Sequence, residues 1–163
     1  MPNRNGSRRQ ARVYALQALY YQDVGQVAPN KALNALWASL LDADGVDGER
    51  APEAEETEFA MRVVQGVEAK QAEIDALIES ASTNWRLRRM PVVDRNILRI
   101  AAFELMTCDD IPATVSVNES VELAKLFGTE DSRAFVNGIV DRIGRQLGRL
   151  PEGGTGRRKR DDG

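Results

Sequence analysis

Arginine residues gather near the amino end of the chain and again in its middle, in a pattern that could bind nucleic acid. Arg8, Arg9 and Arg12 precede Tyr20 on one predicted helix, and a second basic cluster lies at 86–89. Arginine contacts phosphates and stacks on bases, and an aromatic ring gives an unstacked base a platform. The pattern predicts binding of single-stranded RNA. The alternative is that both clusters are ordinary solvated helix faces, and spacing alone does not decide between the two.

The charge distribution narrows the class of nucleic acid. The chain has 22 basic and 25 acidic residues, a net charge of −3, but the charges are segregated. Residues 1–12 hold four arginines and no acid, 42–58 hold eight acids against one arginine, and 157–160 are all basic. Because non-specific duplex binding depends on neutralising many phosphates, an acidic chain favours a short, sequence-specific, single-stranded RNA.

The sequence offers few residues that could carry out catalysis. The 163 residues include no histidine, the usual general base and the commonest metal ligand. Cys108, the one cysteine, has no histidine to activate it and is predicted to be a small buried residue. No glycine-rich phosphate-binding motif stands between a strand and a helix. We therefore expect no enzyme, no cofactor and no metal site.

The elements that must position these residues are helical, and the chain is organised around one of them. A helix from Val93 to about Cys108 is apolar on most of its circumference, which predicts cover from several sides. Arg95 and Arg99, four residues apart, share one of its faces and join the RNA-binding candidates. Glu104 lies in the apolar row. Either it reaches water at the helix edge, or it is buried and accepts hydrogen bonds from an arginine or a loop, and we favour the second.

Helical spacing recurs along the rest of the chain, and no stretch shows strand alternation. The sequence predicts an all-α bundle of about six or seven helices. Besides the central one, helices are expected over about 8–23, 30–41, 55–82, 117–127 and 129–147. Ser116 and Glu119 fit a capping box, and Thr129 is a candidate cap. Gly66 and Gly138 indicate close approach of neighbouring helices; the alternative at Gly66 is that the glycine merely weakens its helix by about 1 kcal/mol.

The chain is expected to be one domain over 1–150, with sub-bundles at about 8–82 and 83–148 and a flexible basic tail at 151–163. No apolar run reaches the roughly 18–20 residues that span a bilayer, and no secretory signal is recognisable. One cysteine excludes an internal disulfide. We expect a cytoplasmic protein.

Four blocks of sequence carry a family resemblance. They are Arg8–Tyr20, Asp94–Leu105, Val117–Lys125 and Asp131–Val140. Their order and spacing resemble the NusB family of bacterial transcription antitermination factors over about residues 7–147. Residues 24–57 match only loosely, and the basic tail is not a shared feature.

The resemblance implies two packed three-helix sub-bundles that bind boxA RNA, a U-rich single-stranded element of ribosomal RNA leaders. It also implies a heterodimer with NusE, a ribosomal small-subunit protein, in an antitermination complex with RNA polymerase. Self-association as a homodimer stays open. The positions that match the family's RNA-binding residues are Arg8, Arg9, Arg12, Tyr20, Asp131 and Phe135. Asp94 matches a position involved with NusE, where other members often carry glutamate.

Two other functions remain open. One is a helical adaptor that binds only protein. The other is a stand-alone relative of the RNA-binding domain at the front of some ribosomal RNA methyltransferases. No nucleotide-cofactor domain is recognisable within the 163 residues, so we expect the methyltransferase alternative to be wrong.

Overall fold

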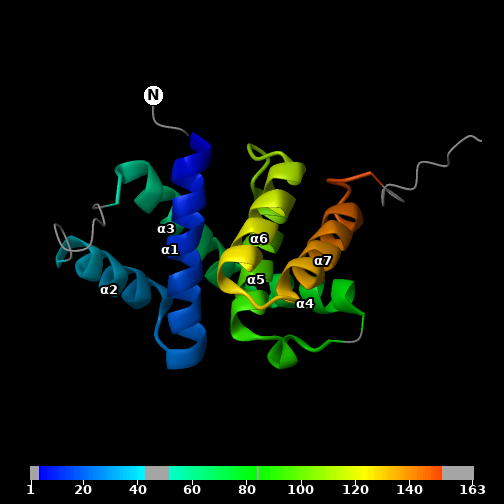
Figure 1. Cartoon of the computed structure of the whole chain (residues 1–163), viewed down its shortest axis with the longest axis horizontal. Coiled ribbons are helices and arrows are strands. Elements are labelled where there is room, and N and C mark those ends of the chain that lie inside the picture. The colour runs from blue at the N-terminus through cyan, green and yellow to red at the C-terminus, as the bar shows by residue number, and fades with distance from the viewer. Residues whose placement is uncertain (1–3, 43–51, 84, 152–163) are drawn as a thin grey trace, which may run out of the picture.

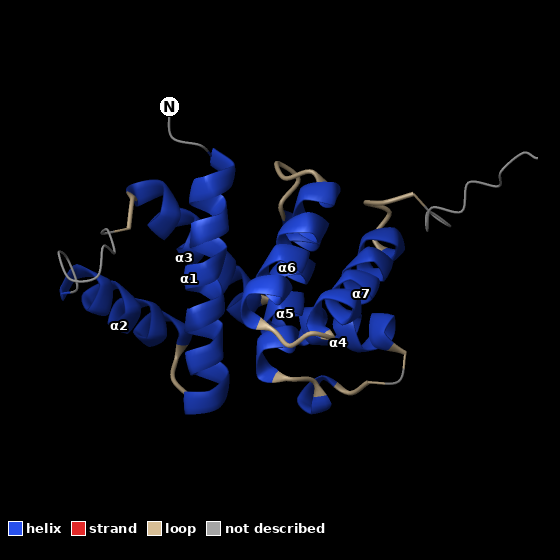
Figure 2. Cartoon of the chain, viewed as in Figure 1, coloured by secondary structure: helices blue, strands red, loops and turns tan. Residues whose placement is uncertain are grey.

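The computed structural model of the chain describes residues 4–42, 52–83 and 85–151. Within these ranges it is helical, with no strand, so the predicted all-α class is confirmed (Figure 1, Figure 2). The elements are α1 Arg4–Gly25, α2 Pro29–Asp42, α3 Ala54–Ala69, α4 Gln71–Ser82, the 3-10 turn η1 Leu87–Arg89, α5 Val92–Thr107, α6 Ala113–Phe127 and α7 Ser132–Gln146. Residues 43–51 of the acidic stretch 42–58, and 152–163 of the tail predicted at 151–163, lie outside the described residues.

The helices form two groups, seen side by side in Figure 1. In the first, α1 packs on α2 and α3; in the second, α5, α6 and α7 pack on one another. Contacts of α1 and α3 with α5 join the groups. The fourth helix, α4, lies against α5 and α7, so it belongs with the second group. The sequence instead placed residues 71–82 in the first sub-bundle.

The single helix predicted over 55–82 is wrong, because the chain changes direction at Lys70. That residue has φ −116° and ψ 19°, outside the α-helical region, and separates α3 from α4. The turn stays hydrogen-bonded: the Lys70 N–H donates to the Gly66 carbonyl at 3.1 Å, and its own carbonyl accepts from the Ile74 N–H at 2.9 Å. Apolar spacing is helical on both sides of Lys70, so periodicity alone does not reveal the break.

The predicted central helix is confirmed as α5. It contacts α1, α3, α4, α6 and α7, and nearly its whole circumference is buried. Gly66 of α3 shows how closely α5 is covered, because a Cβ there would lie only 2.0 Å from the Phe103 ring. The predicted close approach at Gly66 is therefore confirmed. At Gly138 it is wrong, because a Cβ there would meet nothing within 4 Å.

Two predicted helix starts are also wrong. The sixth helix begins at Ala113 after Pro112, so Ser116 lies inside it and forms no capping box with Glu119. Proline fits such a start because its fixed φ suits a helix and it has no N–H to satisfy. The last helix begins at Ser132, and the Thr129 N–H donates to the Ser132 hydroxyl at 2.9 Å instead of Thr129 acting as its cap.

Candidate nucleic-acid interface

Glu104 lies at the centre of a buried polar network that joins α1, α5 and α6. Its carboxylate accepts from the Arg12 Nε at 2.8 Å and Nη2 at 2.7 Å, and from the Ser116 hydroxyl at 3.0 Å. Both charged side chains are only 2% exposed. The prediction that Glu104 is buried and accepts from an arginine is confirmed. The same geometry leaves the Arg12 guanidinium enclosed, so a bound RNA does not reach it in this conformation.

Arg9 lies one helical turn before Arg12 and faces outward. Its side chain is 50% exposed, and its Nε and Nη2 both donate to the Glu119 carboxylate of α6 at 3.0 Å. Glu119 itself is buried, and it also lies 4.0 Å from Arg12. The contact fixes the direction of the Arg9 side chain while half of its surface stays open to a ligand.

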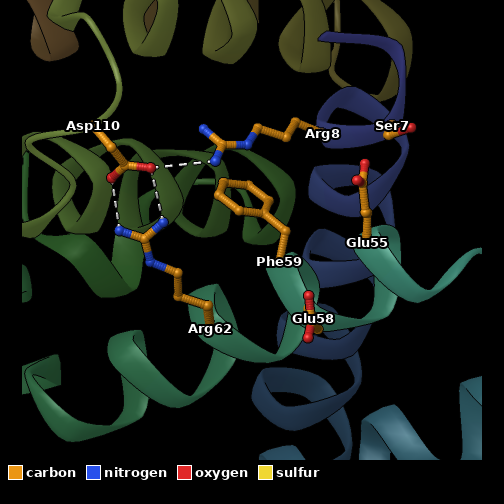
Figure 3. A pocket seen from close by; sticks show the side chains of 7 residues that line it. All are labelled: Ser7, Arg8, Glu55, Glu58, Phe59, Arg62 and Asp110. Carbon is orange, nitrogen blue, oxygen red and sulfur yellow. Dashed lines mark hydrogen bonds and ion pairs between the residues drawn. The ribbon is translucent and has the colours of Figure 1, made fainter. Parts of the chain in front are cut away.

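Arg8 points away from α1 into a second ion-pair cluster, with Arg62 of α3 and Asp110 of the loop between α5 and α6 (Figure 3). Arg8 donates to Asp110 at 3.2 Å, and Arg62 donates to it at 3.2 and 2.8 Å. Hydrogen bonds from Arg62 dominate over partial burial and hold the pKa of Asp110 well below its usual range. The Arg8 guanidinium also lies 4.8 Å from the centre of the Phe59 ring, a cation–π contact.

The hollow around Arg8 and Arg62 does not suit a phosphate at its base. It has a volume of about 430 Å³, and Glu55 and Glu58 line it together with Asp110. Three carboxylates therefore outnumber two arginines. The outward surfaces of Arg8 and Arg9 remain the basic part of this face. Arg62 was not predicted from the sequence, because one arginine on a helix of mixed charge has no distinguishing spacing.

Arg95 and Arg99 share a face of α5, as predicted, and both bind acids. Arg95 donates to Asp23 of α1 at 2.6 and 2.7 Å, while Arg99 donates to Asp23 at 3.1 Å and to Asp75 of α4 at 2.9 and 3.1 Å. Burial alone would raise the pKa of Asp23, but hydrogen bonds from Arg95 and Asn96 and the two positive charges outweigh it and lower the pKa. The cluster therefore ties α1, α4 and α5 together.

Tyr20 lies away from Arg8 and Arg9, about three turns further along α1. It is 41% exposed and lines an apolar groove of about 750 Å³ between α1, α2 and the end of α6. The larger apolar side chains of the groove are Tyr14, Leu16, Tyr20, Tyr21, Leu36, Leu40, Val93 and Phe127. Sequence periodicity did not reveal this groove, because its residues come from four separate helices.

Asp94 and Asp131 lie near each other in the fold, at the starts of α5 and α7, but differ in exposure. Asp94 is only 4% exposed, and burial raises the pKa of its carboxyl, while a hydrogen bond from Ser132 opposes the rise. Its Oδ1 atom has no partner within the described residues. Asp131 is exposed at the N-cap of α7, and Phe135 is half-buried one turn later.

The described residues hold no group of three or more potential metal ligands. Cys108 is buried as predicted, and burial raises the pKa of its thiol. None of the described helices combines the length and the apolar character that crossing a membrane requires.

Comparison with known proteins identifies the family. Residues 9–145 match the NusB family. The transcription antitermination protein NusB of Desulforapulum autotrophicum is 49% identical over 138 residues, 85% of this chain and 91% of that protein. NusB of Myxococcus xanthus is 46% identical over 138 residues, 85% of this chain and 94% of that protein.

Solved structures of NusB proteins have the same fold as this chain. NusB of T. maritima superposes with a TM-score of 0.73 at 33% identity, covering 88% of this chain and 97% of that one. A structure of NusB and NusE with double-stranded RNA has a TM-score of 0.72 at 24% identity, covers 86% of this chain and 97% of that one, and supports the fold alone. The fold is that of an all-helical class of transcription regulators. The chain belongs to the NusB family.

Proposed function

We propose that this chain is a transcription antitermination factor that binds boxA RNA of ribosomal RNA leaders together with NusE and helps RNA polymerase read through terminators. The observation that carries the proposal is the match of residues 9–145 to the NusB family, with relatives 46–49% identical that are transcription antitermination proteins. It is a regulatory protein and not an enzyme. Its place of action is the cytoplasm, where bacterial transcription occurs.

Arg8 and Arg9 are the proposed phosphate contacts on the first helix. Arg9 supports this role best, because half of its side chain is exposed while Glu119 orients it. Arg12 acts beneath them as a positioning residue, since its pair with Glu104 fixes this part of α1 against α5. Arg95 and Arg99 likewise act by holding Asp23.

The carboxy-terminal group contributes Asp131 and Phe135 to the proposed RNA surface. Asp131 is exposed and can accept hydrogen bonds from base amino groups, which are donors. Phe135 follows one helical turn later and offers part of its ring to an unstacked base. Tyr20 is the remaining candidate, and its place in the apolar groove would put RNA and protein partner next to each other.

The apolar groove is the proposed NusE site. Tyr21 and Phe127 expose 58% and 43% of their surfaces there, and exposed apolar patches rimmed by polar residues mark protein interfaces. Val93 brings the start of α5 into the groove. Its neighbour Asp94 is buried and supports this surface through Ser132 instead of offering its carboxyl to the partner.

Titration calorimetry with NusE tests the groove. Phe127→Ser is expected to weaken NusE binding at least tenfold, because residues at the centre of an apolar interface dominate its affinity. Leu126→Ser is a matched control, since Leu126 is 59% exposed but does not line the groove. Equal NusE affinity in the Phe127 variant and the wild type would contradict the assignment.

A purified transcription reaction tests the function as a whole. With a boxA leader and NusE present, adding the chain should raise the fraction of transcripts that pass a downstream terminator, and a scrambled boxA should abolish the gain. If the chain binds NusE but gives no gain and no RNA binding, the adaptor function is favoured instead.

A further inference from the structure

A second aromatic site lies where the end of α4 meets the first turns of α7, separate from the Arg8–Arg9 surface. Trp85 is 51% exposed, and its ring meets the Phe135 ring edge to face, with centroids 5.9 Å apart and an interplanar angle of 73°. A hollow of about 270 Å³ opens beside them, lined by both rings and by Gly138 and Arg142. Half of the Trp85 surface therefore stays open to a planar ligand.

Two hydrogen bonds hold the backbone at Trp85 and just after it. The Ser82 hydroxyl donates to the Trp85 carbonyl at 2.8 Å. Two residues later Leu87 is buried, and its N–H donates to the Glu79 carboxylate at 3.2 Å. Hydrogen bonds at Trp85 and at Leu87 thus anchor this segment to the end of α4, and a site that is already ordered loses less entropy when it binds.

Gly138 leaves room in the hollow. A Cβ at this position would meet nothing within 4 Å. Arg142, one turn further along α7, donates to the Ala81 carbonyl at the end of α4 at 2.9 Å and is otherwise exposed at the rim. The hollow therefore combines aromatic walls, an open floor and a positive charge at its edge.

The segment that carries Trp85 also carries uncompensated positive charge. Arg86 and Arg88 are exposed, and no carboxylate among the described residues forms an ion pair with either guanidinium. The hollow on their other side is lined by four arginines and three acids: Arg86, Arg88, Arg95, Arg99, Asp23, Asp75 and Glu79. Arg95 and Arg99 already bind Asp23 and Asp75, which leaves Arg86 and Arg88 beside one further acid, Glu79, whose carboxylate accepts from the Leu87 N–H.

We propose that Trp85 stacks an unpaired nucleobase of single-stranded RNA in this hollow, and that Arg86 and Arg88 bind the phosphates beside that base. The inference rests on the proposed RNA-binding function and adds one nucleotide subsite to it. Stacking accepts any base, so the subsite lengthens the bound RNA and does not select its sequence. The two arginines without an ion pair favour a ligand that carries several phosphates over an apolar protein surface.

Tryptophan fluorescence tests the stacking directly. The chain has two tryptophans, and Trp37 is half-buried with an edge-to-face contact to Tyr14, so Trp37→Phe leaves Trp85 as the sole reporter. Titration with unlabelled boxA RNA is expected to quench this emission, following the same curve as anisotropy of labelled RNA. Saturated RNA binding with unchanged Trp85 emission would overturn the proposal.

Affinity measurements test the same subsite independently. Trp85→Leu removes the aromatic face and should weaken RNA binding by roughly 5- to 100-fold, whereas Trp85→Phe should retain most of the affinity. Arg88→Gln should lower the slope of log affinity against log salt by about 1. Lys31→Gln, an exposed charge on α2, is the matched control and should leave the slope unchanged.

The outcomes separate this inference from the proposed function. If the wild type binds no RNA, with or without NusE, both fail. If Arg9→Gln weakens RNA binding while Trp85→Leu does not, only the Trp85 subsite fails. If Trp85→Leu weakens NusE binding without RNA and leaves RNA affinity intact, the site belongs to a protein partner and the inference is overturned.

Discussion

Arg12 and Glu104, 92 residues apart in the sequence, form a two-pronged ion pair with N–O distances of 2.8 and 2.7 Å. Each side chain is only 2% exposed. The pair holds the first helix against the central one beneath Arg9, and Ser116 of α6 adds a third donor to the same carboxylate. The arrangement links the stability of the fold to the orientation of the proposed RNA surface.

Breaking this pair should be costly. Arg12→Met leaves the Glu104 charge buried without its main partner, which typically destabilises a protein by about 3–5 kcal/mol. The double variant Arg12→Met with Glu104→Leu removes both charges and should recover much of that loss. Urea unfolding of both single variants and the double variant measures the coupling. Additive effects would contradict the account of a coupled buried pair.

Gly66 should not tolerate a side chain. Gly66→Ala places a methyl group against the Phe103 ring and should destabilise the fold by about 1–3 kcal/mol through overpacking. Gly138→Ala is the matched control, because its Cβ meets open space and helix propensity should stabilise the fold by up to about 1 kcal/mol. Thermal unfolding measures both. The account is wrong at this contact if the two variants shift the midpoint in the same direction.

Asp94 should make stability fall as the pH rises through the acidic range. Burial raises the pKa of its carboxyl in the folded state, so the folded chain favours the protonated form. This contribution is fully present below the unfolded pKa, about 4, and is lost as the pH rises through the raised folded value. Asp94→Asn should therefore be more stable than the wild type at pH 7 and nearly equal to it at pH 3. Exposed Asp109→Asn is the control and should change stability little at either pH.

Arg9 and Glu119 should have opposite effects on RNA affinity. Arg9→Gln removes a proposed phosphate contact and should weaken boxA binding and lower its salt dependence by about one charge. Glu119→Gln removes the carboxylate that faces Arg9 and should strengthen binding, because the phosphate no longer competes with a full negative charge. Anisotropy at two salt concentrations measures both. Weaker binding in both variants would indicate that the Arg9–Glu119 geometry itself is recognised.

The sequence predicted the features that depend on local spacing or on the cost of burying charge. The helical class, the central helix and the buried Glu104 all follow from the apolar period and from one acid in an apolar row. Gly66 was identified from its place near the apolar stripe of its helix, although the same reasoning failed at Gly138. These features need no knowledge of which helices meet.

Features that depend on packing between distant helices could not be predicted. The break at Lys70 leaves the apolar period intact, so only the position of α4 against α5 and α7 reveals it. The acids that bind Arg12, Arg95 and Arg99 come from other helices. The sequence around each arginine therefore gives no sign that its side chain is held in an ion pair and positions its neighbours. The groove around Tyr20 and the Trp85–Phe135 contact arise in the same way.

The most direct test of the central claim is fluorescence anisotropy of labelled boxA RNA with this chain, alone and with NusE, beside a scrambled RNA of equal length. The account predicts tighter binding to boxA than to the scrambled RNA, and a further gain when NusE is present. Equal affinity for the two RNAs, unaffected by NusE, would contradict it.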